Sequence, residues 1–356
     1  MKPPKGAIKP RLAVVKMAPY HPPTAGRAGK LRLDFNENTV GCSPRVVEAL
    51  REAIDAPHLT MYPEYGEARE AIARFFEVEP SQFTFTNGTD EAIQAFVNTY
   101  VDAGQDVVLL RPSYAMYRFY CEVAGARIRE VEYTPPGMEF PLQSLLEAIT
   151  PETRAVLLAN PNNPTGTGTS LAGIERILHR ARKAVVLVDE AYYEFSGVTA
   201  LTEIARVPNL FVCRTFSKVF GMAAMRLGCL FSHAANIECV RKAQSPYSVN
   251  SLAVAAARAA VEDTEYVEQY VGEVLAAREL LCLGLERLGI RYIPSSANFV
   301  LGDFGGRAVE VRDALRGRAI LVRDRSYEAP GCVRITVGTR EQTRQLLEAL
   351  SEVWNS

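Results

Sequence analysis

The chain has 356 residues, roughly two to three times the usual length of one domain, so we expect a large core and a smaller second lobe. With 48% hydrophobic residues, 23% charged residues and a formal net charge of -1, the composition excludes bulk attraction to nucleic acid or anionic membrane. No apolar run reaches the roughly 18 to 20 residues that span a bilayer, and the first residues lack the core of a signal peptide. We therefore expect a cytoplasmic enzyme.

The cysteines and histidines show no ligand pattern. The seven cysteines are scattered, odd in number and never in CxxC spacing, and the four histidines have no ligand spacing either. We expect reduced cysteines that serve in packing, no disulfide framework and no metal.

The first 40 residues are expected to form an extended arm that leads into a strand. Residues 1–30 are rich in Pro, Gly and Lys, which favours an extended arm over a packed element. Tyr20 is held between prolines there, and an alternating strand at Leu33 leads into Asn36 and Asn38. Turn chemistry alone would account for these residues equally well. A helix over residues 44–54 follows, with Ser43 as its N-cap.

From residue 82 onward, strands alternate with helices. Tyr62 lies in the loop before a helix over residues 67–76. Strands are then expected at residues 83–86, 107–110, 126–133, 155–159, 185–188 and 210–213, with helices at residues 90–100, from 112, at 141–149 and from about 167 to 183. This order predicts a mainly parallel sheet that is covered on both faces. Such sheets bind ligands at the carboxyl ends of their strands.

Four candidate residues follow the carboxyl ends of these strands: Thr89, Asn163, Asp189 and Lys218. Lys218 lies in an apolar stretch with glycines, where burial lowers the pKa of an amine towards its nucleophilic, neutral form. That makes it a candidate Schiff-base lysine, with a surface lysine as the alternative.

Asp189 directly follows four apolar residues, which indicates a partly buried carboxylate. A buried carboxylate needs a partner, for which a protonated heterocyclic nitrogen would serve, and a helix cap is the alternative. At Gly88 and Thr89 a helix is entered through glycine, so its free N–H groups suit a phosphate, although a plain capped helix would look the same.

The chain after residue 250 reads as a small α/β lobe. Helices are expected at residues 251–261 and 266–288, and the longer helix is expected to bridge the lobes. Strands and helices then alternate to a terminal helix over residues 340–354. On the strand at residues 333–337, Arg334 points to the opposite face from its apolar neighbours. It suits a carboxylate or phosphate, and a structural salt bridge is the alternative.

Several motifs together resemble the fold type I, pyridoxal-phosphate-dependent aminotransferases. They are Asn163-Pro164-Thr165-Gly166, Asp189-Glu190-Ala191-Tyr192, Ser217-Lys218 with Arg226, and Arg334 to Thr339. Further details are similar to the histidinol-phosphate aminotransferase branch, namely Pro19-Tyr20, Asn36-Glu37-Asn38, Tyr62-Pro63, Gly88 to Glu91 and Val322-Arg323-Asp324. The resemblance implies a three-layer α/β large domain with a mainly parallel sheet and a smaller α/β domain. Residues 1–40 would be the arm and part of the small domain, 41–247 the large cofactor-binding domain, and 248–356 the small domain.

The resemblance also implies a role for each candidate. Lys218 would form the Schiff base with pyridoxal 5'-phosphate and then act as general base. Asp189 would keep the pyridine nitrogen protonated, while Asn163 and Tyr192 would bind the ring hydroxyl and Tyr114 would stack on the ring. The groups implied for the cofactor phosphate are Gly88, Thr89, Asp90, Thr215, Ser217, Arg226 and Tyr62 of a neighbouring subunit. That last contact implies a homodimer with shared active sites.

For the substrate, the resemblance implies that Arg334 and Arg323 bind its acidic end, with Tyr20 and Asn36 lining the same pocket. The implied reaction is ping-pong transamination between histidinol phosphate and 2-oxoglutarate in histidine biosynthesis. An aromatic amino acid aminotransferase and a threonine-phosphate decarboxylase remain alternatives on the same fold. A cofactor-sensing regulator would need an added DNA-binding domain, for which we expect no room before residue 19.

Overall fold

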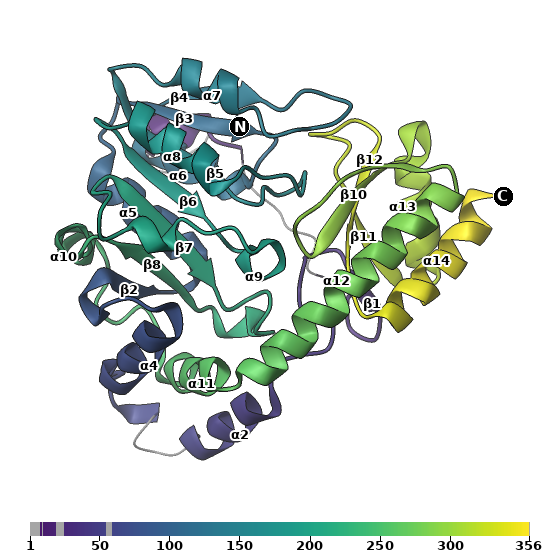
Figure 1. Cartoon of the computed structure of the whole chain (residues 1–356), viewed down its shortest axis with the longest axis horizontal. Helices are drawn as coiled ribbons and strands as arrows, with labels where there is room; N and C mark the ends of the chain where they lie inside the picture. The colour runs from purple at the N-terminus through teal and green to yellow at the C-terminus, as the bar shows by residue number, and fades with distance from the viewer. Residues whose placement is uncertain (1–7, 9, 19–24, 55–58, 356) are drawn as a thin grey trace.

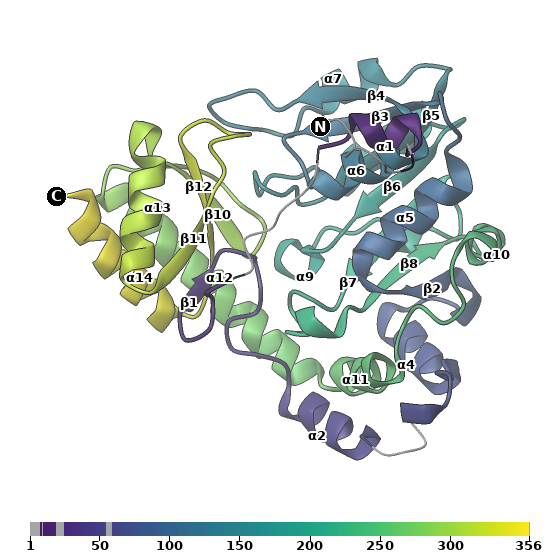
Figure 2. The same cartoon turned by 180° about the vertical axis from the view of Figure 1, so that it is seen from behind.

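Two sheets, each with its own helices, make up the molecule (Figures 1 and 2). The structure is a computed structural model that describes residues 8, 10–18, 25–54 and 59–355. The long helix α12 (Thr264–Arg287) runs from the first sheet's helices to the second sheet (Figure 1). Within the described residues, every helix is too short or too polar to cross a bilayer.

The first sheet has seven strands and is mostly parallel, as the sequence predicts. Its spatial order is β2 (Phe83–Thr86), β8 (Gly228–Ser232), β7 (Leu210–Thr215), β6 (Val185–Asp189), β5 (Thr153–Ala159), β3 (Asp106–Arg111) and β4 (Arg127–Glu132). Only β8 runs antiparallel to its neighbours β2 and β7. The strands β3, β5, β6 and β7 are apolar on both faces because helices cover both faces.

Alternate residues of these strands enter two separate cores. Val107 and Leu109 face one side, whereas Val108 and Leu110 face the other. The first side is covered by α5 (Gly88–Tyr100), α6 (Ala115–Ala124) and α10 (Ala234–Ala243). The other side is covered by α4 (Gly66–Phe76), α7 (Leu142–Ala148), α8 (Leu171–Arg180) and α9 (Tyr193–Ser196). The second core continues into the other lobe, so the two lobes share apolar packing.

The second sheet joins the two ends of the chain. Its order is β1 (Leu31–Leu33), β11 (Ile320–Asp324), β12 (Cys332–Thr336), β10 (Phe299–Asp303) and β9 (Arg291–Ile293). The helices α12, α13 (Ala308–Gly317) and α14 (Arg340–Trp354) lie beside it (Figure 1). Strand β1 runs parallel to β11 with Leu33 opposite Val322. Residues 34–38 therefore leave this sheet next to β11 and cross towards the first sheet.

The remaining elements complete the base of the first lobe. Helix α2 (Pro44–Ala53) begins at Ser43, whose hydroxyl accepts the Arg45 amide, as the N-cap prediction requires. It packs with α4 against α11 (Ser251–Glu262). Short 3-10 turns are η1 (Pro80–Gln82), η2 (Leu201–Glu203), η3 (Ala223–Met225) and η4 (Gly305–Arg307).

Some elements differ from the sequence prediction. The arm contains a short helix, α1 (Leu12–Lys16), beside α6 (Figure 2), because residues 11–18 include neither Pro nor Gly. Helix α6 begins at Ala115, three residues later than predicted, since Tyr114 is still extended. Strand β8 was not predicted, because Gly221 and Gly228 interrupt the apolar pattern after Lys218, and helix α10 was not predicted either.

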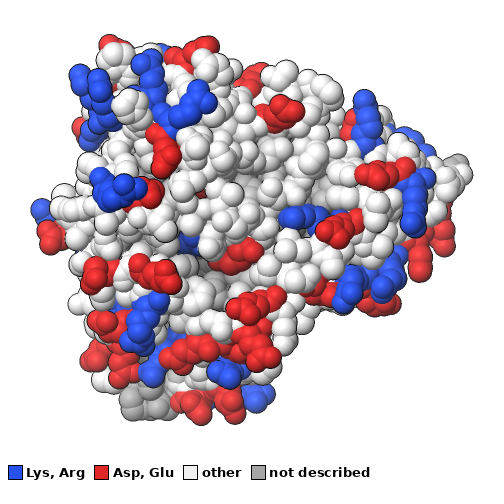
Figure 3. Space-filling model, viewed as in Figure 1, with Lys and Arg blue, Asp and Glu red and all other residues white. Residues whose placement is uncertain are grey.

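The surface carries both signs of charge. On the face shown in Figure 3, acidic and basic side chains are interspersed around the rim, and the middle is mainly uncharged. This distribution matches the formal net charge of -1, so any anion site has to be built locally.

Candidate active site

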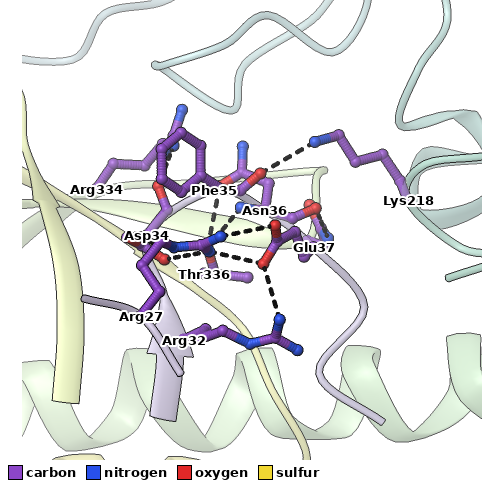
Figure 4. A network of polar contacts seen from close by, with 10 residues as sticks. Arg27, Arg32, Asp34, Phe35, Asn36, Glu37, Lys218, Arg334 and Thr336 are labelled. Carbon is purple, nitrogen blue, oxygen red and sulfur yellow. Dashed lines mark hydrogen bonds and ion pairs between the residues drawn. The ribbon is translucent and has the colours of Figure 1, made fainter. Parts of the chain in front are cut away.

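Lys218 lies three residues beyond the end of β7, in a loop that faces the segment after β1. Its Nζ donates a hydrogen bond of 3.0 Å to the main-chain oxygen of Phe35 (Figure 4). Burial, and secondly the positive charge of Arg334, lowers the pKa of Lys218 to about 8 from its ordinary value of 10.5. The amine is thus much easier to deprotonate than a surface lysine.

Close backbone contacts hold the lysine loop in place. The Asn38 side-chain amide donates to the carbonyl of Val219 over 3.0 Å. Gly221 has φ of 68°, and a Cβ there would lie 2.3 Å from the carbonyl oxygen of Gly41. Only glycine allows this approach, so the segment after β1 and the lysine loop are fixed against each other.

Asp189 is the last residue of β6 and is 4% exposed. Its carboxylate accepts the Tyr117 hydroxyl over 2.7 Å and the Ala191 amide over 3.0 Å. Burial raises the pKa of Asp189, while these donors oppose the rise. Among the described residues no cation forms an ion pair with it, so a cationic ligand atom would supply the missing partner.

Two tyrosines at the start of α6 frame this carboxylate. Tyr114 donates its hydroxyl to Asp90 over 2.7 Å, and its ring meets the ring of Tyr117 edge to face at 5.6 Å. Burial raises the pKa of both phenols, so they act as neutral donors. The sequence analysis missed Tyr117, although its position three residues after Tyr114 on a helix would have indicated it.

A tight turn and an arginine surround the amino terminus of α5. Gly88 has φ of 71°, and a Cβ there would lie 2.6 Å from Nη2 of Arg226. A Cβ on Gly228 would lie 3.0 Å from the Thr89 amide nitrogen. The Arg226 guanidinium also meets the Asp90 carboxylate at 3.3 Å. These contacts bring a guanidinium to free helix amides, an arrangement that suits an anion.

Hydroxyl groups lie at the adjoining strand ends. The Thr215 hydroxyl accepts the Ser217 amide over 3.1 Å, and both residues are buried. The Thr86 hydroxyl is buried without a partner among the described residues, and a Cβ on Gly228 would come within 3.0 Å of it. The same region therefore offers further donors to an anion.

The other end of the site is built on Arg334. This side chain is 5% exposed and donates to the Asn163 side-chain oxygen and to the carbonyl of Asp34, each over 2.6 Å. Its Nε is buried without a partner in the described part of the chain. Burial, followed by Arg325 and to a smaller degree Arg323, lowers the pKa of Arg334 to about 10.

Arg323 and Arg334 lie directly opposite each other on β11 and β12. Arg325 is buried and bonds to the Tyr327 hydroxyl over 2.7 Å and to the Glu328 carboxylate. Like charges opposite each other on a ladder are unfavourable unless an anion joins them. Sequence reasoning missed Arg325, which the spacing of two residues from Arg323 would have indicated.

Asn36 connects the two lobes at the centre of the site. Its φ is 55°, its amide donates to the Thr336 hydroxyl over 2.9 Å, and its side chain donates to the Tyr192 hydroxyl over 3.0 Å. Tyr192 is buried, and its ring centroid lies 5.8 Å from Nζ of Lys218. Figure 4 shows Asn36 beside Thr336, on the segment whose Phe35 carbonyl meets Lys218.

One predicted residue that the structure describes, Tyr62, does not take part in these contacts, and a second one, Tyr20, cannot be placed. Tyr62 is 75% exposed and stacks on Tyr247 with 4.4 Å between ring centroids. Tyr20 lies outside the described residues. The other predicted residues line the region between Lys218 and Arg334 or the amino terminus of α5.

Comparison with known proteins identifies the family of this chain. The model of the family aminotransferase class I and II matches residues 28–350. A histidinol-phosphate aminotransferase of Symbiobacterium thermophilum is 39% identical over 355 residues, covering 96% of this chain and 97% of the relative.

Solved structures agree with this match. A histidinol-phosphate aminotransferase of Sinorhizobium meliloti in complex with pyridoxal-5'-phosphate superposes with a TM-score of 0.82 at 28% identity, covering 91% of both chains. An aspartate aminotransferase of Thermus thermophilus with maleate gives a TM-score of 0.80 at 26% identity, also over 91% of both chains. The fold is therefore shared by enzymes named for different substrates.

Proposed function

Because this chain belongs to the class I and II aminotransferases, we propose that it transfers the amino group of histidinol phosphate to 2-oxoglutarate by a ping-pong route, as a step of histidine biosynthesis. The chain is a pyridoxal-phosphate-dependent aminotransferase. The observation that carries the assignment is a buried lysine with a lowered pKa within one site that also holds Asp189 and two arginines.

The residues present fit pyridoxal phosphate. The buried Asp189 lacks a cationic partner, which a protonated pyridine nitrogen would supply. The glycine turn at Gly88 lets the Arg226 guanidinium approach the amino terminus of α5, where it and the helix amides suit a phosphate. When bound, the cofactor supplies an aldehyde for the amine and a ring that accepts the electrons of the broken bond.

Lys218 is the proposed catalytic base. In its neutral form the amine can join the cofactor, and once released it can carry the proton of the substrate α-carbon. The carbonyl of Phe35 accepts a hydrogen bond from Nζ of Lys218 and so orients the free amine. Asp189 would hold the ring nitrogen in its charged form, with Tyr117 and Ala191 orienting the carboxylate.

The ring and its phosphate have proposed partners in the described site. Tyr114 would lie against the ring face, and Tyr192 and Asn163 would bind the ring hydroxyl through the donor atoms that their present contacts leave available. The phosphate would take the amides of Gly88, Thr89 and Asp90, the hydroxyls of Thr215 and Ser217, and the guanidinium of Arg226.

The acidic end of each substrate would bind at Arg334 and Arg323. The buried Nε of Arg334 has no partner among the described residues, and Arg323 and Arg334 lie opposite each other on neighbouring strands. A phosphate dianion would compensate both charges. Asn36 and Tyr20 would line this pocket, and the contacts of Asn36 with both lobes support a role in their alignment.

We propose a homodimer with shared active sites. An open groove of about 820 Å³ lies between α2, α4 and α11, and exposed Met61 and Tyr62 line it. A second copy would cover this surface and receive Tyr62 at its cofactor phosphate.

We also propose the division at residues 40 and 247 into arm, large domain and small domain. We further propose a cytoplasmic location, which the seven unpaired cysteines support.

The function is tested by assaying the purified protein in parallel with histidinol phosphate, phenylalanine and threonine phosphate. The proposal requires amino transfer from histidinol phosphate to 2-oxoglutarate to have the highest kcat/KM. A higher value for phenylalanine would favour the aromatic alternative, and release of carbon dioxide from threonine phosphate would favour the decarboxylase.

A further inference from the structure

Arg323 lies in the candidate active site and forms no ion pair with an acidic residue among those that the structure describes. It faces Arg334 across β11 and β12 and contributes to lowering the pKa of Arg334. In the part of the chain that the structure describes, the recorded contact of its guanidinium is with the ring of Phe35, 5.5 Å from the centroid. Its charge is therefore held in place but not paired.

The acidic residues near Arg323 are engaged elsewhere. Arg27 binds Asp34 at 2.8 Å and Glu37 at 2.7 Å, as Figure 4 shows. Asp324, the next residue after Arg323, pairs with Arg312 at 3.5 Å. These three described carboxylates thus each have another arginine as their partner.

The sheet register brings Phe35 to this position. Leu33 of β1 lies opposite Val322 of β11, so the chain passes Arg323 just as it leaves the strand. The Phe35 ring contacts the Arg27 guanidinium at 4.3 Å as well as that of Arg323. An aromatic ring attracts a cation without cancelling its charge, which a carboxylate in the same place would do.

We propose that Phe35 determines specificity for the acidic end of the substrate, because its ring holds Arg323 beside Arg334 with its charge free for a doubly charged phosphate ester. This inference rests on the proposed function only for the identity of the amino donor, histidinol phosphate. The ligand class is a phosphate monoester, preferred over a carboxylate or a neutral group.

The test is a double-mutant cycle with Phe35→Leu and Arg323→Gln, in which kcat/KM is measured for histidinol phosphate and for phenylalanine. A shift of the Phe35 carbonyl that meets Lys218 would lower both kcat/KM values together and would leave their ratio unchanged. We expect Phe35→Leu to lower the ratio of the two values about 3- to 30-fold, the strength of a cation–π contact. In the Arg323→Gln background the same substitution should leave the ratio unchanged.

Two further variants serve as controls for the cycle. Phe35→Tyr keeps an aromatic face and should retain the wild-type ratio. Trp354→Leu removes a comparable contact, that with Arg307 at 4.9 Å, which lies outside the site, and should also retain it. Additive effects of Phe35→Leu and Arg323→Gln on the ratio would overturn the inference.

Binding to the holoenzyme separates this inference from the proposed function. Calorimetry with phenyl phosphate and with benzoate measures anion preference without turnover. A weaker affinity for phenyl phosphate in Phe35→Leu, with benzoate changed less, supports the inference even if histidinol phosphate proves not to be the donor. Equal losses for both ligands would overturn it, even if histidinol phosphate is the best donor.

Discussion

At Lys218, burial brings the pKa of a cation down to about 8, whereas at Arg334 comparable burial leaves the pKa at about 10. The amine can therefore lose its proton near neutral pH, and the guanidinium cannot. The difference comes from the groups themselves, because a guanidinium begins from a much higher value and spreads its charge over three nitrogens.

The two ends of the site thus divide the chemistry between them. The cofactor end uses Lys218 and Asp189, whose proton affinities respond to their surroundings. The acid-binding end uses arginines whose charge stays fixed. The residues around them determine only which groups these arginines pair with. Variants at the first end should change chemistry, and variants at the second should change which substrate is used.

The largest effect is expected at the cofactor end. Lys218→Ala should lower turnover more than about 10³-fold, since the loss of a general base alone costs roughly 10² to 10⁴. It should also abolish the visible absorption of the cofactor-loaded protein, while circular dichroism stays that of the wild type. The matched control is Lys242→Ala on the exposed surface of α10, which should keep both activity and absorption. Full activity of Lys218→Ala would contradict the assignment.

At the acid-binding end, Arg323→Ala should change selectivity. We expect kcat/KM for histidinol phosphate to fall about 10- to 100-fold, the value of a hydrogen bond to a charged group. Phenylalanine should lose less, because it presents no phosphate to Arg323. Equal losses for both substrates would remove the distinction between the two ends and favour the aromatic alternative.

The pH dependence of cofactor uptake tests the tuning of the amine. The folded pKa of Lys218 is about 8, below 10.5, so the neutral fraction rises about tenfold per pH unit below 8 and levels off above it. The rate at which cofactor-free protein takes up pyridoxal phosphate should follow this curve in stopped-flow absorption. A rate that keeps rising beyond pH 10 would show that the pKa of Lys218 is not lowered.

The smallest effect is expected behind Asp189. Tyr117→Phe removes one buried hydrogen bond and keeps the ring, so cofactor affinity should fall less than about tenfold, since such a bond contributes roughly 1 kcal/mol. Equilibrium dialysis measures this change. The control Tyr270→Phe alters a buried tyrosine of α12 and should leave the affinity unchanged. An unchanged affinity in Tyr117→Phe would mean that the Ala191 amide suffices to orient Asp189.

Much of the fold could be predicted from local pattern. The apolar strands β3, β5, β6 and β7 were clear because a sheet buried on both faces needs continuous apolar runs. The short helix α1 and the strand β8 were missed, since one buries no side chain and the other follows a glycine-rich stretch. Helix α1 forms where neither Pro nor Gly interrupts the chain, whereas β8 is fixed by its pairing with β2 and β7.

The sequence by itself determined that Asp189 and Lys218 follow the ends of two apolar strands in a mainly parallel sheet, because strand ends are local features and the carboxyl ends of such strands lie at one edge. Only the tertiary structure decided that Asp34 and Asn36 meet Arg334 and Thr336, 300 positions away. Those contacts depend on the register of β1 against β11, and so does the contact of Phe35 with Arg323. A shift of one residue would turn the side chains to the other face, and no local pattern specifies such a long-range pairing.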